Sequence, residues 1–63
     1  MANTIAVRVT NKCGDDVAIT NFFEDGQYAT PGYCVVDVNG EEAHVSIESL
    51  LDAVIALGAI HGN

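Results

Sequence analysis

The dipeptide Asn39-Gly40 is the feature that most constrains the fold, because it predicts a tight β-hairpin. A two-residue type I′ turn needs a positive φ at both central positions, which Asn and Gly tolerate best. The flanking residues 33–38 and 41–46 have the alternating side chains of two paired strands. With Asn39-Gly40 as the loop, Val38 pairs with Glu41, and this pair sets the register of the whole hairpin.

This register gives the hairpin one apolar face and one mixed face. On the apolar face, Val36 lies opposite Ala43 and Cys34 lies opposite Val45. The mixed face carries the pairs Tyr33–Ser46, Val35–His44 and Asp37–Glu42. Such a pattern is typical of a sheet that is covered on one side only. A slip of one residue would exchange the faces of one strand, so the register is strongly specified.

An amphipathic helix is predicted directly after the hairpin. Ser46 is a suitable N-cap, and Glu48 lies in the first turn, where the helix dipole favours negative charge. At about 100° per residue, the large apolar side chains fall on one arc of the helix and small ones on the other. The apolar arc contains Ile47, Leu50, Leu51, Val54, Ile55, Leu57 and Gly58. We expect the helix to end at Gly58 or Gly62, because either can adopt the left-handed conformation that follows many helices.

The first half of the chain predicts further strands. Residues 4–10 alternate, residues 17–23 read as a second strand, and residues 27–30 read as a short third strand. Pro31-Gly32 suits the centre of a type II turn, or else a break within a longer strand. We therefore predict one α+β domain over residues 1–63: a small antiparallel meander of three or four strands, with one C-terminal helix packed on one face. An all-β fold with a frayed tail is the alternative.

The charge of the chain limits the partners that it can bind. Nine Asp and Glu residues face only two bases, Arg8 and Lys12, which gives a net charge of −7. Such a surface repels nucleic-acid phosphates and anionic membranes, and attracts basic surfaces. We therefore expect no direct binding to nucleic acid or to a membrane. Hydrophobic residues make up 49% of the chain, too many for a disordered acidic tail.

Cysteine usage and the lack of a signal pattern predict a cytoplasmic location. Residues 1–12 lack the apolar segment of a secretory signal, and the apolar run 50–60 is too short to span a bilayer. In the cytosol Cys13 and Cys34 are expected to stay reduced, although a disulfide between them remains the alternative.

No catalytic or metal site is predicted from the residues that could build one. The candidate ligands Cys13, Cys34, His44 and His61 are far apart in sequence, whereas structural zinc sites usually take two ligands from a close pair. His44 lies on the hairpin face opposite Cys34, so these two cannot form a nucleophile–base pair. We therefore expect no metal, no cofactor and no enzymatic activity.

Three acidic pairs at predicted turns are the strongest candidates for a binding surface. In a meander alternate turns share one end of the sheet. If residues 27–38 count as one strand, Asp15-Asp16 and Glu41-Glu42 are expected to lie together, with Glu24-Asp25 at the opposite end. Asp37 lies opposite Glu42, and like charges there destabilise a sheet. A destabilising pair without local compensation favours a binding role. The alternative is that the acids only keep a small protein soluble.

The main functional hypothesis is a non-enzymatic acidic module that docks on a basic surface of a larger protein, one that itself binds nucleic acid. In bulk properties the chain resembles small acidic accessory proteins of viruses and mobile elements that inhibit host enzymes. An inhibitor that occupies a nucleic-acid-binding groove is one form of this hypothesis. The predicted contact residues are Asp15, Asp16, Phe22, Tyr33, Asp37, Glu41 and Glu42.

The alternative function is a structural subunit that associates with itself. It would form a homodimer or a higher oligomer through the small outer arc of the C-terminal helix. The predicted contact residues are Ser49, Ala53, Ala56 and Ile60.

Overall fold

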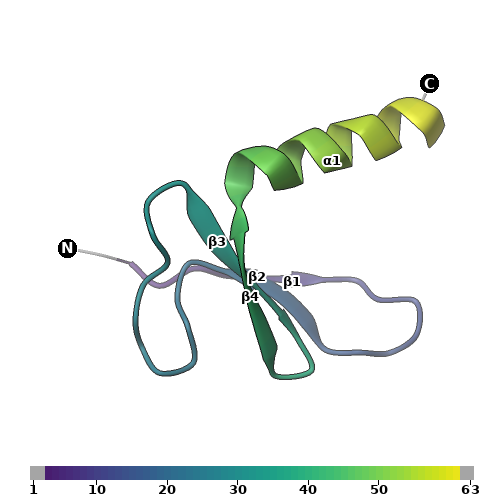
Figure 1. The fold of residues 1–63 in the computed structure, drawn as a ribbon. Helices are drawn as coiled ribbons and strands as arrows, with labels where there is room; N and C mark the ends of the chain where they lie inside the picture. The colour runs from purple at the N-terminus through teal and green to yellow at the C-terminus, as the bar shows by residue number, and fades with distance from the viewer. Residues whose placement is uncertain (1–2, 62–63) are drawn as a thin grey trace.

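The computed structural model describes residues 3–61, and within this range it has one antiparallel sheet followed by one helix (Figure 1). The elements are β1 (Ala6–Val9), β2 (Val17–Thr20), β3 (Tyr33–Val38), β4 (Glu41–Ser46) and α1 (Ile47–His61). The strands lie in the order β1-β2-β3-β4, each antiparallel to the next. The predicted α+β meander with a C-terminal helix packed on one face is confirmed.

The central hairpin has the predicted register at every pair, from Val38 opposite Glu41 to Tyr33 opposite Ser46. Asn39 and Gly40 have φ values of 54° and 91°, the two positive angles that a type I′ turn requires. Of the two alternatives for Pro31-Gly32, the turn is observed. Gly32 has a φ of 87°, and the Tyr33 N–H donates to the Thr30 carbonyl at 2.8 Å.

The second strand ends earlier than predicted, and residues 21–32 leave the sheet. The Thr20 hydroxyl donates to the Phe22 carbonyl at 2.7 Å, and the Asn21 side-chain oxygen accepts the Ile5 N–H at 2.7 Å. Polar side chains that bind the backbone in this way compete with the sheet ladder. The segment then folds on itself through a single bridge between Phe22 and Tyr28, so the predicted third strand over residues 27–30 is wrong.

Helix α1 follows β4 without any connecting residue. The Ser46 hydroxyl oxygen accepts the Ser49 N–H at 3.2 Å, which confirms the predicted N-cap. The Ile47 N–H donates to the Gly32 carbonyl at 3.0 Å and ties the helix start to the preceding turn. The predicted end at Gly58 is wrong: the helix continues to His61, because one glycine inside a helix costs only about 1 kcal/mol. Gly62 lies outside the described residues.

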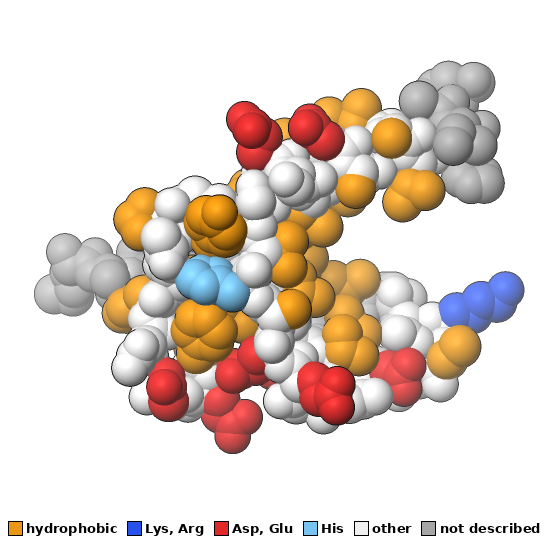
Figure 2. Space-filling model, in the orientation of Figure 1, with side chains coloured by type: hydrophobic (Ala, Val, Ile, Leu, Met, Phe, Trp, Pro, Cys, Tyr) orange, Lys and Arg blue, Asp and Glu red, His pale blue; other side chains and the backbone are white. Residues whose placement is uncertain are grey.

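The packing of the helix on the sheet is confined to one end. In the described part of the chain α1 contacts only β3 and β4, and only Cys34 and Val35 are buried. The radius of gyration is 12.8 Å, against about 10.6 Å for a compact domain of this length. Figure 1 shows the helix extending away from the sheet, and Figure 2 shows hydrophobic side chains lining the hollow between them.

Candidate functional site

A shallow depression of about 230 Å³ lies on the mixed face of the sheet, away from the helix. Ala6, Ala18 and Thr20 are short side chains of β1 and β2, so the surface sinks between their longer neighbours. Of the described side chains that line it, four are carboxylates and one is a guanidinium, a formal charge of −3. The other lining residues are Arg8, Asp16, Phe22, Glu24, Asp37 and Glu42.

The register of the sheet brings these charges together. Arg8 lies opposite Ala18, Ala18 opposite Asp37, and Asp37 opposite Glu42, so one row crosses all four strands on the same face. Figure 2 shows acidic side chains gathered along this side of the molecule, apart from those on the helix. The candidate site is this surface, which we call the acidic face: Asp16, Phe22, Glu24, Asp37 and Glu42, with Arg8 at its edge.

The acidic pair Asp37–Glu42 is compensated by the backbone, contrary to the prediction. An Asp37 carboxylate oxygen accepts the Gly40 N–H at 2.8 Å, and a Glu42 carboxylate oxygen accepts the Glu24 N–H at 2.7 Å. Hydrogen bonds from neutral donors to a carboxylate stabilise its charged form. The repulsion between the two side chains is therefore no argument for binding by itself.

The second of these bonds also corrects the predicted position of Glu24. We expected Glu24-Asp25 at the end of the sheet opposite Glu41-Glu42. Instead, the excursion over residues 21–32 places Glu24 beside Glu42, on the acidic face. The strand patterns over 17–23 and 27–30 predict that this segment folds back on itself, but they do not indicate its contact with Glu42. The excursion is held mainly by backbone hydrogen bonds: the Phe23 N–H to the Gln27 carbonyl at 2.7 Å, and the Ala29 N–H to the Asn21 carbonyl at 2.9 Å.

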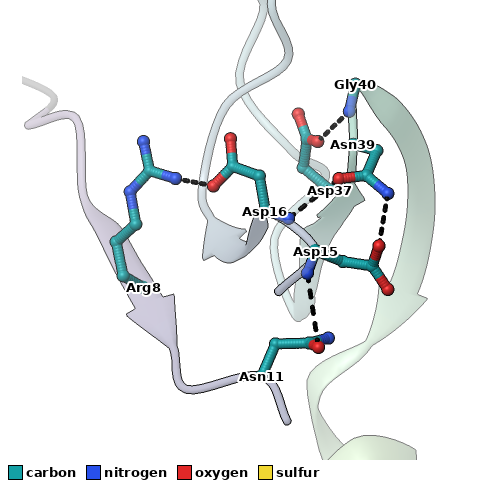
Figure 3. Close-up of polar contacts among 7 residues, drawn as sticks. All are labelled: Arg8, Asn11, Asp15, Asp16, Asp37, Asn39 and Gly40. Atoms are coloured by element: carbon teal, nitrogen blue, oxygen red, sulfur yellow. Dashed lines mark hydrogen bonds and ion pairs between the residues drawn. The ribbon is translucent and has the colours of Figure 1, made fainter. Parts of the chain in front are cut away.

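Asp15 and Asp16 are fastened to the β3–β4 turn, as Figure 3 shows. The Asp16 N–H donates to the Asn39 side-chain oxygen at 2.8 Å, and the Asn39 side-chain amide donates to Asp15 at 3.1 Å. The Asp16 carboxylate forms an ion pair with Arg8. The predicted meeting of the turn at Asp15-Asp16 with the β3–β4 turn is therefore observed, and the contact is direct.

Five of the seven predicted contact residues line or adjoin the depression. Asp16, Phe22, Asp37 and Glu42 line the depression, and Asp15 adjoins it through Asn39. The other two do not line the depression, although Tyr33 lies on the same mixed face. Tyr33 packs edge-on against His44, with ring centroids 5.1 Å apart, and Glu41 shares a register position with Val38 of the apolar face. Arg8 and Glu24 line the depression although neither was among the predicted residues.

His44 holds the excursion onto the mixed face. Its Nε2 accepts the Thr30 N–H at 3.1 Å, and its ring packs edge-on against Phe23 at 5.2 Å as well as against Tyr33. Val35, the most buried residue among those described, lies opposite His44 in the register. The predicted placement of His44 and Cys34 on opposite faces is confirmed, and His44 has a packing role that the sequence did not indicate.

The residues predicted for self-association lie on α1. Ser49, Ala53 and Ala56 are exposed, as are most residues of the apolar arc. Ile60 belongs to the helix, and its side chain lies outside the described part of the structure. Their role stays a prediction.

The remaining candidates are placed as follows. Cys13 is exposed, Cys34 is buried, and both are free thiols. Among the described residues no group of three or more His, Cys, Asp or Glu side chains is arranged to hold a metal ion. Within the same residues, no helix combines the length and apolar character needed to cross a membrane.

Comparison of the chain with protein-family models, with curated proteins and with solved structures found no match.

Proposed function

We propose that this chain is a non-enzymatic binding module whose acidic face docks on a basic surface of a larger protein. The proposed basic surface is a nucleic-acid-binding groove, which the module would occupy as an inhibitor. Small acidic accessory proteins of viruses and mobile elements act in this way on host enzymes. The compartment is the cytosol, where Cys13 and Cys34 remain thiols.

The observation that carries the proposal is the convergence of four carboxylates and one aromatic ring on a single depression. Asp16, Glu24, Asp37 and Glu42 come from four separate stretches of the chain, and Phe22 lies among them, half-buried. An aromatic side chain surrounded by charges of one sign combines an apolar anchor with long-range attraction. Lys and Arg side chains of a partner complement the negative charge of the acidic face.

The hydrogen bonds of the acidic face support binding in a second way. Each carboxylate has about four acceptor sites on its two oxygens, and the backbone bonds to Asp37 and Glu42 leave most of them available. These bonds fix the side chains before any partner arrives, so less rotamer freedom is lost on association. The ion pair with Arg8 is exposed, and a partner's guanidinium can replace it.

The test compares two double variants that remove equal charge from different places. Glu24→Gln with Glu42→Gln neutralises the acidic face and keeps an acceptor for the Glu24 N–H. Glu48→Gln with Asp52→Asn removes the same charge from α1. Calorimetric titration with a short Lys- and Arg-rich peptide is expected to show a loss of affinity of about tenfold for the first pair, equivalent to 1.4 kcal/mol, and little change for the second.

Salt dependence and competition complete the test. Binding of the wild-type chain should weaken steeply with added salt, because exposed charges are screened beyond about 8 Å at physiological ionic strength. A pull-down from a lysate of the native host supplies the natural partner, and competition with duplex DNA and with RNA then tests occupation of its groove. Equal losses for the two double variants, or binding that is indifferent to salt, would contradict the proposal.

A further inference from the structure

The apolar face of the sheet and the apolar arc of α1 face each other across an open groove. Their side chains are 40–59% exposed, values typical of the surface and not of a core. Figure 2 shows this groove as the hollow lined by hydrophobic side chains. Its exposed residues are Ile5, Val7, Val9 and Val38 on the sheet side and Ile47, Leu51, Val54, Ile55 and Leu57 on the helix.

The exposed area is larger than a single folded chain of this mass should have. The chain exposes 4946 Å², whereas a compact monomer of 6.6 kDa exposes about 3,900 Å². The excess of about 1,000 Å² per chain matches what one partner buries in a stable interface, about 800 Å² in the standard case and more in an obligate dimer. A continuous apolar patch of this kind marks an interaction site.

The chain cannot close the groove with its own helix. Ser46 ends β4 and Ile47 begins α1, so no connecting residue is present to let the helix turn back toward β1 and β2. Two contacts fix its direction: the bond from the Ile47 N–H to Gly32 and the cap from Ser46 to Ser49. Among the described residues, α1 makes no contact with β1 or β2.

We propose that a second copy of this chain fills the groove, each helix packing its apolar arc on the exposed sheet face of the other copy. Each chain carries both halves of the contact, an uncovered helix arc and an uncovered sheet face. Within one chain these two surfaces do not reach each other. A two-fold axis satisfies both at once, as in any isologous interface. The helix arc used is the inner one, which contains Val54, and not the outer arc of Ala53 and Ala56 on which the sequence-based alternative rests.

Charge favours a second copy over a basic partner at this groove. The exposed groove residues are all apolar, so Lys and Arg side chains would find no carboxylate among them. The acids that line the depression lie on the opposite face of the sheet, and Glu48 and Asp52 lie on the outer arc of the helix. Of the acids, Glu41 alone shares a register row with the apolar face, and it is exposed at the sheet edge. Two chains can therefore meet here without burying a carboxylate.

The first experiment measures mass in solution by size exclusion with light scattering at several concentrations. The wild-type chain is expected at twice its mass of 6.6 kDa. Val54→Glu, on the inner arc, should weaken the dimer at least tenfold, whereas the matched Ala56→Glu, on the outer arc, should leave it intact. A strict monomer, an oligomer larger than two, or dissociation by Ala56→Glu in place of Val54→Glu would overturn the proposal.

A second experiment uses the unaltered chain, because Val54→Glu alone could act by unfolding. Isotope-labelled and unlabelled chains are mixed, and a filtered NOE spectrum then reports only contacts between copies. We expect cross-peaks between methyl groups of Val54 or Leu57 in one copy and Val7 or Val9 in the other. A filtered spectrum without them, at a concentration where the mass is that of a dimer, would refute this arrangement.

Discussion

Asn39 and Asp16 exchange two hydrogen bonds and so join the central turn to the residue that precedes β2. The Asn39 N–H donates to the Asp16 carbonyl at 2.8 Å, and the Asp16 N–H donates to the Asn39 side-chain oxygen at the same distance. The residue that makes the type I′ turn therefore also fixes the end of the acidic face. A turn that the sequence predicts for local reasons has a second role across the sheet.

Replacing Asn39 by Gly should separate these two roles. Gly adopts the positive φ of the turn, so the hairpin geometry is kept, while the side-chain bonds to Asp15 and Asp16 are lost. We expect the free energy of unfolding to fall by about 1–2 kcal/mol, measured by urea denaturation at one fixed protein concentration. Asp15→Ala, which removes only one of these bonds, is the control and should cost less. Equal stability of Asn39→Gly and the wild type would show that the side-chain clamp contributes nothing.

Removing the base at the edge of the acidic face should strengthen binding to a basic probe. Arg8→Gln frees Asp16 and makes the depression more negative, so affinity for a Lys- and Arg-rich peptide is expected to rise and its salt dependence to steepen. The stability change should stay below about 1 kcal/mol, because both partners of the ion pair are mostly exposed, at 74% and 65%.

Lys12→Gln is the matched control for Arg8→Gln. It makes the same change in net charge on an exposed residue of the β1–β2 connection, outside the depression. An equal gain in affinity for both variants would mean that the probe senses total charge and not the acidic face.

His44 should stabilise the fold more through its ring than through its hydrogen bond. His44→Phe keeps an aromatic ring beside Phe23 and Tyr33 but loses the acceptor for the Thr30 N–H; His44→Ala loses both. His44 is exposed, so water can reach the freed N–H of Thr30. We expect the free energy of unfolding to fall by about 1 kcal/mol in His44→Phe and by about 2 kcal/mol in His44→Ala. Near-ultraviolet circular dichroism should report the changed setting of Tyr33. A larger loss for Phe than for Ala would contradict this ranking.

The two thiols should react with a labelling reagent at very different rates. Cys13 is exposed, whereas Cys34, in β3, is only 6% exposed. We expect Cys13 to be modified at the rate of an unfolded peptide, and Cys34 at least about tenfold more slowly, because it must wait for a local opening that costs 1.4 kcal/mol or more. Mass spectrometry of the digested chain assigns the sites. Similar rates for both thiols would show that the fold does not shield Cys34.

The local features of the second half of the chain were predictable because each rests on adjacent residues. Asn39-Gly40 determines its own turn, the alternation around it determines the register, and Ser46 determines the start of the helix. The end of the helix was predicted as one of two glycines. It passes Gly58 and ends at His61, directly before Gly62 in the sequence, because whether a glycine terminates a helix depends on the residues that follow and not on glycine alone.

The candidate site could be predicted only in part, because it depends on the excursion over residues 21–32. The pairing of Asp37 with Glu42 follows from the hairpin, and both were expected at the site. The addition of Glu24 follows from its N–H reaching Glu42, a contact between residues far apart in the sequence that no local pattern encodes. The same limit applies to the apolar arc of α1: periodicity indicates which residues share the arc but not how much of it the sheet covers, and most of its large side chains are exposed and do not form a core.

Under the proposed pairing, the direct junction of Ser46 and Ile47 would make the survival of this chain depend on its abundance. If the groove is closed by a second copy, the monomer exposes the apolar arc of its helix to proteases and to non-specific binding. In the dimer that arc is buried. Mass action then makes folding concentration-dependent, so halving the total concentration of the chain lowers the concentration of the dimer by more than half. On that proposal, a cell would keep this protein only where it is made in quantity, and clear it soon after synthesis stops.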